Sequence, residues 1–168
     1  MAKGTKGAAA AAVAAASRVP PNVAHGVGVT LAFFVLYYAF LFAQGTLKRK
    51  LRAYYAAQGK KFDRYFSRDR KMLGWDRTVG NMHEQMGPFL TLFWTNIWLS
   101  PYGGLLSHEY VAAIGWLYVL LRSFYPVLWF SGGGGVGGTF PMIWRVTFPM
   151  YLIIIIFAVN AGVTIYGA

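Results

Sequence analysis

Apolar residues gather along the chain in four stretches of about 20 residues, the length that an α-helix needs to cross a bilayer. The stretches cover residues 24–43, 79–99, 109–130 and 141–165. A turn-forming segment at 100–104 and other short connections favour antiparallel neighbours. The pattern therefore predicts an all-α membrane protein, an antiparallel four-transmembrane-helix bundle, within a single domain over residues 24–168.

Composition supports a membrane domain. Of the 168 residues, 57% are hydrophobic and 12% are charged, whereas a soluble domain carries about a quarter charged residues. The chain has no cysteine, so disulfides and thiolate metal ligands are excluded. Since carboxylates do not cluster either, no metal site is expected.

Three segments lie outside the predicted spans. Residues 1–23 are basic and rich in alanine and predict a flexible tail, with a transit peptide as the alternative. Residues 44–78 predict a basic loop, and residues 131–139 a glycine-rich loop. The glycine-rich loop lacks the Gly-Lys-Ser/Thr of a phosphate-binding loop.

Positive charge is concentrated between Lys48 and Arg77, which bound eleven of the sixteen Lys and Arg residues. Three aspartates in the same segment leave a net charge of +8. The positive-inside rule places this loop on the cytoplasmic side or its organellar equivalent. Membrane lipids with anionic headgroups are the expected partners of the loop. Nucleic acid is not expected, because no fold that binds it is present.

Polar residues follow one another at helical spacing where the second span begins. Arg77, Asn81, Glu84 and Pro88 stand at intervals of four, three and four, so an α-helix places them on one face. Glu84 lies roughly 10 Å along the helix from Arg77. A charged residue at that depth is expected to face a cavity, a partner helix or a ligand, because exposure to hydrocarbon is costly.

The third span brings a second polar group to the same depth. Arg122 and Tyr125 stand at i and i+3, and Arg122 lies about 12 Å from the end near Phe130. Two interpretations remain open at this point. The polar residues bind a ligand, or they pair internally, with Arg122 contacting Glu84 and Asn81 bridging two helices.

These residues resemble the MAPEG family, the membrane-associated proteins in eicosanoid and glutathione metabolism, across residues 24–165. The pattern Arg77-x-x-x-Asn81-x-x-Glu84 is similar to the family's second-span motif, and Arg122-x-x-Tyr125 to its third-span motif. The basic segment at 48–52 also fits. The resemblance implies a homotrimer of four-helix protomers in a microsomal membrane of the endoplasmic reticulum, or in a mitochondrial or plastid membrane.

The resemblance also implies glutathione as co-substrate, bound between protomers. Arg77 and Arg122 would hold its carboxylates, Glu84 its ammonium, Asn81 its peptide groups, and Tyr125 would add a phenolic donor. The implied activity is that of a glutathione transferase or peroxidase acting on hydrophobic electrophiles. Glutathione carries two carboxylates and an ammonium, which matches a layer with two cations and one anion.

Two departures from the family pattern concern catalysis. The family's second third-span tyrosine is replaced by Trp129, and the connection to the fourth span is the glycine-rich stretch. The family's thiolate-stabilising arginine lies early in the fourth span, where Arg145 is the only cation. Either the loop delivers Arg145 to the site as the catalytic residue, or the catalytic arginine is lost and Arg145 is an interfacial anchor.

Three hypotheses about function follow. The chain is a membrane glutathione transferase, or a catalytically silent MAPEG-like protein that serves as a scaffold, a lipid-binding protein or an accessory subunit of a larger membrane complex. The third hypothesis is an unrelated four-span subunit whose polar residues only join helices. A thiol-conjugation assay separates the first hypothesis from the other two.

Overall fold

The computed structural model describes residues 19–131 and 141–167. Within these ranges the chain is helical and contains no strand. The described elements are α2 (Pro21–Ala57), α3 (Arg70–Leu99), the short 3-10 helix η1 (Ser100–Tyr102), α4 (His108–Ser131) and α5 (Pro141–Tyr166).

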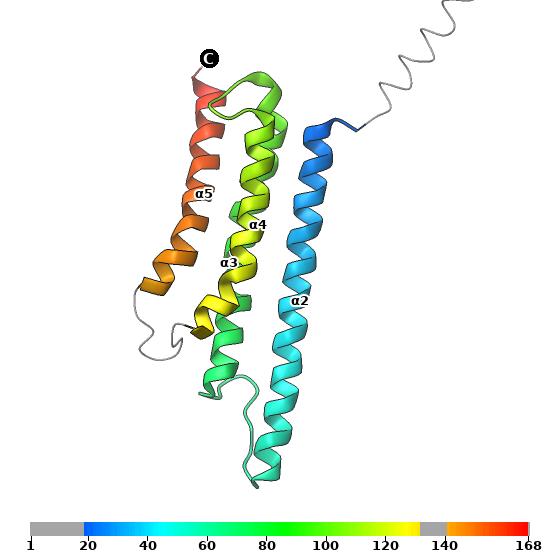
Figure 1. Cartoon of the computed structure of the whole chain (residues 1–168), viewed down its shortest axis with the longest axis vertical. Coiled ribbons are helices and arrows are strands. Elements are labelled where there is room, and N and C mark those ends of the chain that lie inside the picture. The colour runs from blue at the N-terminus through cyan, green and yellow to red at the C-terminus, as the bar shows by residue number, and fades with distance from the viewer. Residues whose placement is uncertain (1–18, 132–140, 168) are drawn as a thin grey trace, which may run out of the picture.

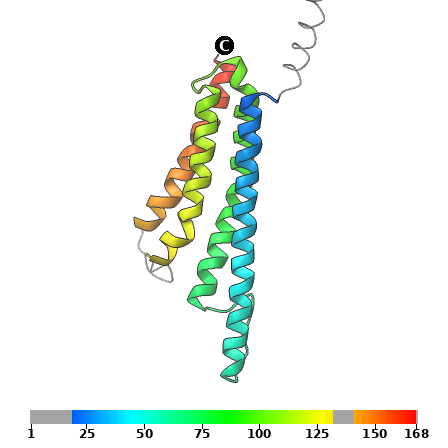
Figure 2. The same ribbon diagram turned by 45° about the vertical axis from the view of Figure 1, so that its right-hand side comes forward.

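Helices α3 and α4 lie between the other two. Each of them contacts α2 and α5, and they also contact one another. Consecutive helices run in opposite directions, so the start of α2 and the end of α5 lie at one end of the molecule (Figures 1 and 2). At the other end, α2 continues past the start of α3. This arrangement brings polar residues of α3, α4 and α5 within reach of one another.

Three helices are long and apolar enough to cross a membrane, over Pro21–Ala57, His108–Phe130 and Thr147–Tyr166. Large apolar side chains such as Leu31, Val35 and Phe42 project outward from α2, with 60%, 70% and 73% of their surface exposed. A surface of this kind suits contact with lipid or with another protein. The membrane character expected from composition is therefore supported.

Helix α3 covers the span predicted at 79–99 but is not among the three apolar helices. Polar residues interrupt its apolar stretch, and three of them, Thr78, Gln85 and Asn96, are buried against the rest of the protein. Helix α3 thus presents polar as well as apolar groups to its neighbours, so its sequence is not evenly apolar.

The basic loop is shorter than the predicted 44–78, because helix covers both of its ends. Helix α2 continues to Ala57 and stops where Gly59 adopts a φ of +68°. The N–H of Lys60 then donates to the carbonyl of Tyr55 (2.9 Å) and that of Gly59 to Ala56 (3.0 Å), which is the glycine-dependent Schellman ending. Helix α3 starts after Asp69, whose Oδ1 accepts from the N–H of Lys71 (2.9 Å), a standard N-cap. Only residues 58–69 form the loop.

Two other predicted segments fall mostly outside the described residues. Of the predicted tail, residues 1–18 are not described, and α2 already begins at Pro21, a favourable residue for a first helical turn. Of the predicted glycine-rich loop, residue 131 belongs to α4 and the remaining residues are outside the description.

Aromatic rings form the centre of the core. Phe89 and Tyr118 are buried and stack with ring centroids 3.7 Å apart, and Phe33 and Phe93 pack against Phe89 at 5.6 Å. The Tyr118 hydroxyl donates to Oε1 of the buried Gln85 (2.9 Å). Contacts between α2, α3 and α4 therefore meet at one aromatic cluster, which fixes the rotation of α3 about its axis.

A buried pair of side-chain amides joins the last turns of α3 to the last turns of α5. Asn160 Nδ2 donates to Asn96 Oδ1 (2.6 Å), and Asn160 Oδ1 accepts from the N–H groups of Leu105 and Leu106 (2.8 and 2.9 Å). Gly104 has a φ of +122° beside Asn160 and Thr164, a conformation that favours glycine. These contacts anchor the turn after η1 to α5.

Candidate functional site

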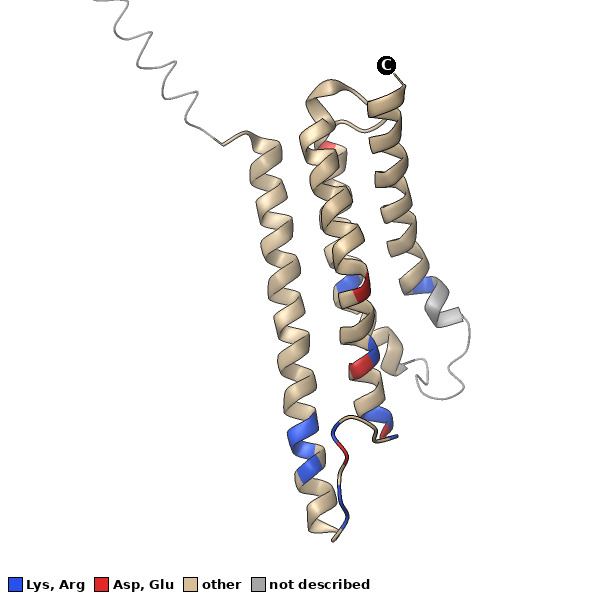
Figure 3. Cartoon of the chain, turned by 180° about the vertical axis from the view of Figure 1, so that it is seen from behind, with Lys and Arg blue, Asp and Glu red and all other residues tan. Residues whose placement is uncertain are grey.

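An open cleft of about 400 Å³ lies between α3, α4 and α5. Its lining combines charged, polar and aromatic groups: Asp76, Arg77, Gly80, Asn81, Glu84, Tyr125, Trp129 and Thr147. Charged residues lie mainly along this half of the ribbon (Figure 3). Four predicted site residues, Arg77, Asn81, Glu84 and Tyr125, therefore share one cleft.

Helix α3 supplies the polar wall of the cleft. Arg77 and Glu84 are exposed and Asn81 is half-buried, as expected for one stripe along a helix. Neither Arg77 nor Glu84 forms an ion pair within 4 Å with another described residue. Pro88, the fourth residue of the predicted stripe, is exposed and does not line the cleft. The cleft thus carries an available cation and an available carboxylate.

Arg122 lies behind this wall and is fully buried. Its Nη1 donates to Oδ1 of Asn81 (2.7 Å) and lies 3.6 Å from the sulfur of Met150. The guanidinium carbon is 5.1 Å from the centre of the Tyr125 ring, within the range of a cation–π contact. These contacts hold the guanidinium between α3, α4 and α5.

The hydrogen bonding of Arg122 is incomplete. Within the described part of the chain, Nε and Nη2 of Arg122 have no hydrogen-bond partner. No described carboxylate lies within 4 Å of the guanidinium, so the expected alternative contact with Glu84 does not form, whereas the bridge by Asn81 does. A buried cation without an anion is costly. The structure therefore leaves a positive charge beside the cleft without a protein anion to balance it.

Aromatic groups of α4 form another part of the lining. Tyr125 and Trp129 stack with centroids 6.3 Å apart and an interplanar angle of 9°. The buried Nε1 of Trp129 has no hydrogen-bond partner among the described residues. Trp129 therefore adds an aromatic surface to the cleft.

Arg145 is exposed on the first part of α5 and is not among the residues that line the cleft. Thr147, two residues later, does line it. The residues that precede α5, from 132 to 140, are outside the described ranges. The assignment of Arg145 as the catalytic residue stays a prediction.

Sequence reasoning missed Asp76, Gly80 and Thr147. Asp76 accepts from Lys48 Nζ (2.8 Å) and from Gln44 Nε2 (2.6 Å), and so joins α2 to α3 at the rim of the cleft. The spacing of four between Asp76, Gly80 and Glu84 was a usable signal, because it places the three on one helical face. No sequence signal pointed to Thr147, because the packing of α5 alone brings it there.

Comparisons of the chain with protein-family models, with curated proteins and with solved structures found no match. The chemistry of the cleft is therefore argued from its own groups. An exposed cation and carboxylate, a buried cation and an aromatic surface suit a small ligand that carries both charges and an apolar part.

Proposed function

We propose that this chain is a MAPEG-like integral membrane protein that binds glutathione in the cleft between α3, α4 and α5. The observation that carries the proposal is the buried Arg122, whose charge has no described anion within 4 Å and which lies behind the Arg77–Asn81–Glu84 wall. An anionic ligand would balance this charge. The cleft volume of about 400 Å³ is within the range of small-molecule sites.

The proposed binding mode follows the charges of the ligand. Arg77 receives one glutathione carboxylate, for which a guanidinium fork is well suited. Glu84 accepts from the γ-glutamyl ammonium, Asn81 hydrogen-bonds the peptide groups, and Tyr125 donates from its phenol. Arg122 attracts the second carboxylate, and it contacts this carboxylate if the Asn81 side chain moves and releases its hydrogen bond to Arg122.

The proposed reaction is conjugation of glutathione to a hydrophobic electrophile. The thiol loses its proton to water, and the thiolate sulfur forms a bond to the electrophilic carbon while the leaving group departs with its electron pair. Arg145 is proposed to stabilise the thiolate. The electrophile would enter from the bilayer. The protomer is proposed to be an antiparallel four-span bundle in a homotrimer of the endoplasmic reticulum or an organellar membrane.

A second candidate is a catalytically silent MAPEG-like scaffold, lipid-binding or accessory subunit. It is favoured by Arg145, which is exposed and does not line the cleft, and by Trp129, which has no hydroxyl. The two candidates agree on the ligand and differ on thiol activation. A thiol-conjugation assay with a chromogenic electrophile distinguishes them.

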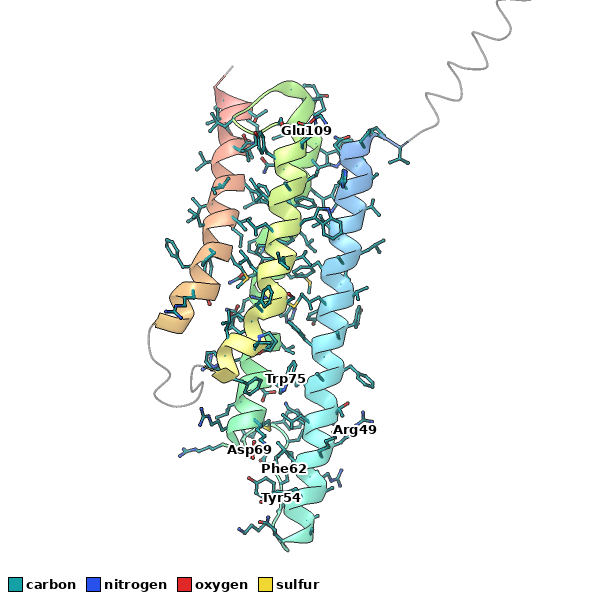
Figure 4. The ribbon with its side chains drawn as sticks, in the orientation of Figure 1. Arg49, Tyr54, Phe62, Asp69, Trp75 and Glu109 are labelled. Carbon is teal, nitrogen blue, oxygen red and sulfur yellow. The ribbon has the colours of Figure 1, made fainter. Side chains whose placement is uncertain are left out.

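The binding proposal is tested by calorimetry on the full chain in mild detergent. Glu84→Gln removes the proposed ammonium acceptor. Because Glu84 is exposed, the expected loss of glutathione binding is that of a solvent-exposed ion pair, ~1 kcal/mol or about 5-fold. Glu109→Gln is the matched control, because Glu109 is exposed near the opposite end of the molecule (Figure 4). Equal affinity of the wild type and Glu84→Gln would refute the assigned role.

A further inference from the structure

A second hollow, of about 330 Å³, lies at the end of α2 that continues past the start of α3. Helix α2 and the loop each contribute three cations to it, together with one alanine and one aromatic ring: Lys48, Arg49, Arg52, Ala56, Lys60, Lys61, Phe62 and Arg64. No carboxylate is among these residues. Figure 3 shows the blue segments of α2 and the loop beside one another, and Figure 4 labels Arg49 and Phe62 in this region.

The three aspartates of this part of the chain have other partners. Asp63 accepts from the N–H groups of Tyr65 and Phe66 (2.8 and 2.9 Å), which lowers its pKa. Asp69 caps α3 through backbone N–H groups, and Asp76 pairs with Lys48 (2.8 Å). The other five cations have no carboxylate within 4 Å among the described residues. Their charge is therefore available to an anion from outside the chain.

Packing of the loop against α2 holds the cations together. The Schellman ending at Gly59 reverses the chain, and the rings of Tyr55 and Phe62 then stack with centroids 5.6 Å apart at 13°. The Tyr55 hydroxyl also donates to Oδ2 of Asp69 (3.2 Å). Like charges repel, so these contacts maintain a concentration of charge that an unstructured loop would disperse.

The hollow lies at the level expected for lipid headgroups. About 20 residues of helix cross the hydrocarbon, whereas α2 has 37. Arg52 lies roughly 12 Å beyond Gln44, the first polar residue after the apolar stretch, at ~1.5 Å per residue. Tyr65 and Phe66 leave 73% and 85% of their surface exposed beside the cations, and exposed aromatic rings are typical of the membrane interface.

We propose that this hollow binds the phosphate-bearing headgroup of an anionic membrane lipid, with Arg52, Lys60, Lys61 and Arg64 as its main ligands. Guanidinium and ammonium groups are the usual partners of phosphate. The exposed aromatic rings favour a lipid over a soluble phosphate, because they place the hollow at the bilayer surface. This site is separate from the cleft, so it does not depend on the proposed glutathione function.

The test measures lipid binding by microscale thermophoresis on the full chain in mild detergent. The probe is dioctanoyl phosphatidic acid, with dioctanoyl phosphatidylcholine and glycerol 3-phosphate as comparisons. Phosphatidic acid is expected to bind at least 10-fold more tightly than either one. Equal binding of phosphatidylcholine would overturn the site, and equal binding of glycerol 3-phosphate would overturn the assignment to a lipid.

Paired variants separate a built site from general attraction. Arg52→Gln with Arg64→Gln is expected to weaken phosphatidic acid binding about 25-fold, which is 5-fold, or ~1 kcal/mol, for each removed cation. Lys50→Gln with Lys71→Gln is the matched control, because both are exposed and lie outside the hollow. The control is expected to stay within 2-fold of wild type, and an equal loss in both pairs would overturn the site.

Thermal unfolding of each variant checks that the fold is intact. If the double variant Arg52→Gln with Arg64→Gln does not fold, the double variant Lys60→Gln with Lys61→Gln replaces it. Lys60 and Lys61 both lie in the loop and line the same hollow. That pair is expected to lose binding to the same extent. Wild-type affinity in a folded Lys60 and Lys61 variant would also overturn the proposal.

Discussion

Replacing Arg122 by Met is expected to stabilise the protein while abolishing glutathione binding. The guanidinium is fully buried, with one hydrogen bond to Asn81 at 2.7 Å and two nitrogens without a described partner. Replacement of buried charges by apolar side chains of similar volume is often neutral or stabilising by ~1–4 kcal/mol. Met150 is already in contact with the guanidinium, so a thioether at position 122 has an apolar neighbour.

The magnitude follows from the opposing contributions. Each unsatisfied buried donor costs ~1–3 kcal/mol, and the hydrogen bond to a charged group contributes ~1.5–3 kcal/mol. Asn81 is half-buried and borders the open cleft, so water can replace its lost partner. We expect a net stabilisation of ~1–2 kcal/mol, which for a chain of this size raises the melting temperature by roughly 2–8 °C.

The assay is thermal unfolding in mild detergent without ligand, followed by tryptophan fluorescence, together with calorimetric titration of glutathione. Arg77→Met is the control, because Arg77 is exposed and its replacement is expected to change stability by less than ~0.5 kcal/mol. A melting temperature of Arg122→Met below that of the wild type would refute this prediction, since it would mean that the nitrogens of the guanidinium have hydrogen-bond partners in the folded protein.

Three further changes have defined expectations. Arg145→Leu is expected to reduce the rate of conjugation by about 10²–10³-fold, the scale of one lost electrostatic stabiliser, with little change in glutathione binding. Ultraviolet absorbance of the thiolate in the glutathione complex at pH 7 checks this expectation. If the wild type and Arg145→Leu both show only neutral thiol, the enzyme proposal is refuted and the scaffold candidate is supported. Asn160→Ala leaves two backbone N–H groups without their acceptor and is expected to cost ~2–4 kcal/mol in unfolding free energy. Gly104→Ala is expected to cost at least ~1–3 kcal/mol, because φ is +122° and a Cβ would meet Thr164. Gly162→Ala, where a Cβ meets nothing within 4 Å, is the control and is expected to be stabilising or neutral.

The sequence by itself determined the helices and their membrane character. The predicted spans 109–130 and 141–165 agree closely with the helical residues of α4 and α5, because apolar length and turn residues act locally. The predicted span 79–99 ends with α3 at Leu99, but α3 begins earlier, at Arg70. Local signals also existed for the true extent of α2, since Gly59 is a typical helix-ending residue. The loop is shorter than 44–78 because those bounds are the ends of the apolar stretches, whereas Lys and Arg are good helix formers and helix continues into the basic segment from both sides.

The sequence also determined the helical face of Arg77, Asn81 and Glu84, because spacing along one helix is sufficient for that. Only the tertiary structure decided which groups meet across helices. It paired Arg122 with Asn81 rather than Glu84, brought Thr147 of α5 into the cleft, and paired Asp76 with Lys48 of α2. These outcomes depend on the rotation and depth of whole helices, which the packing of the aromatic core and the buried Asn96–Asn160 pair set together.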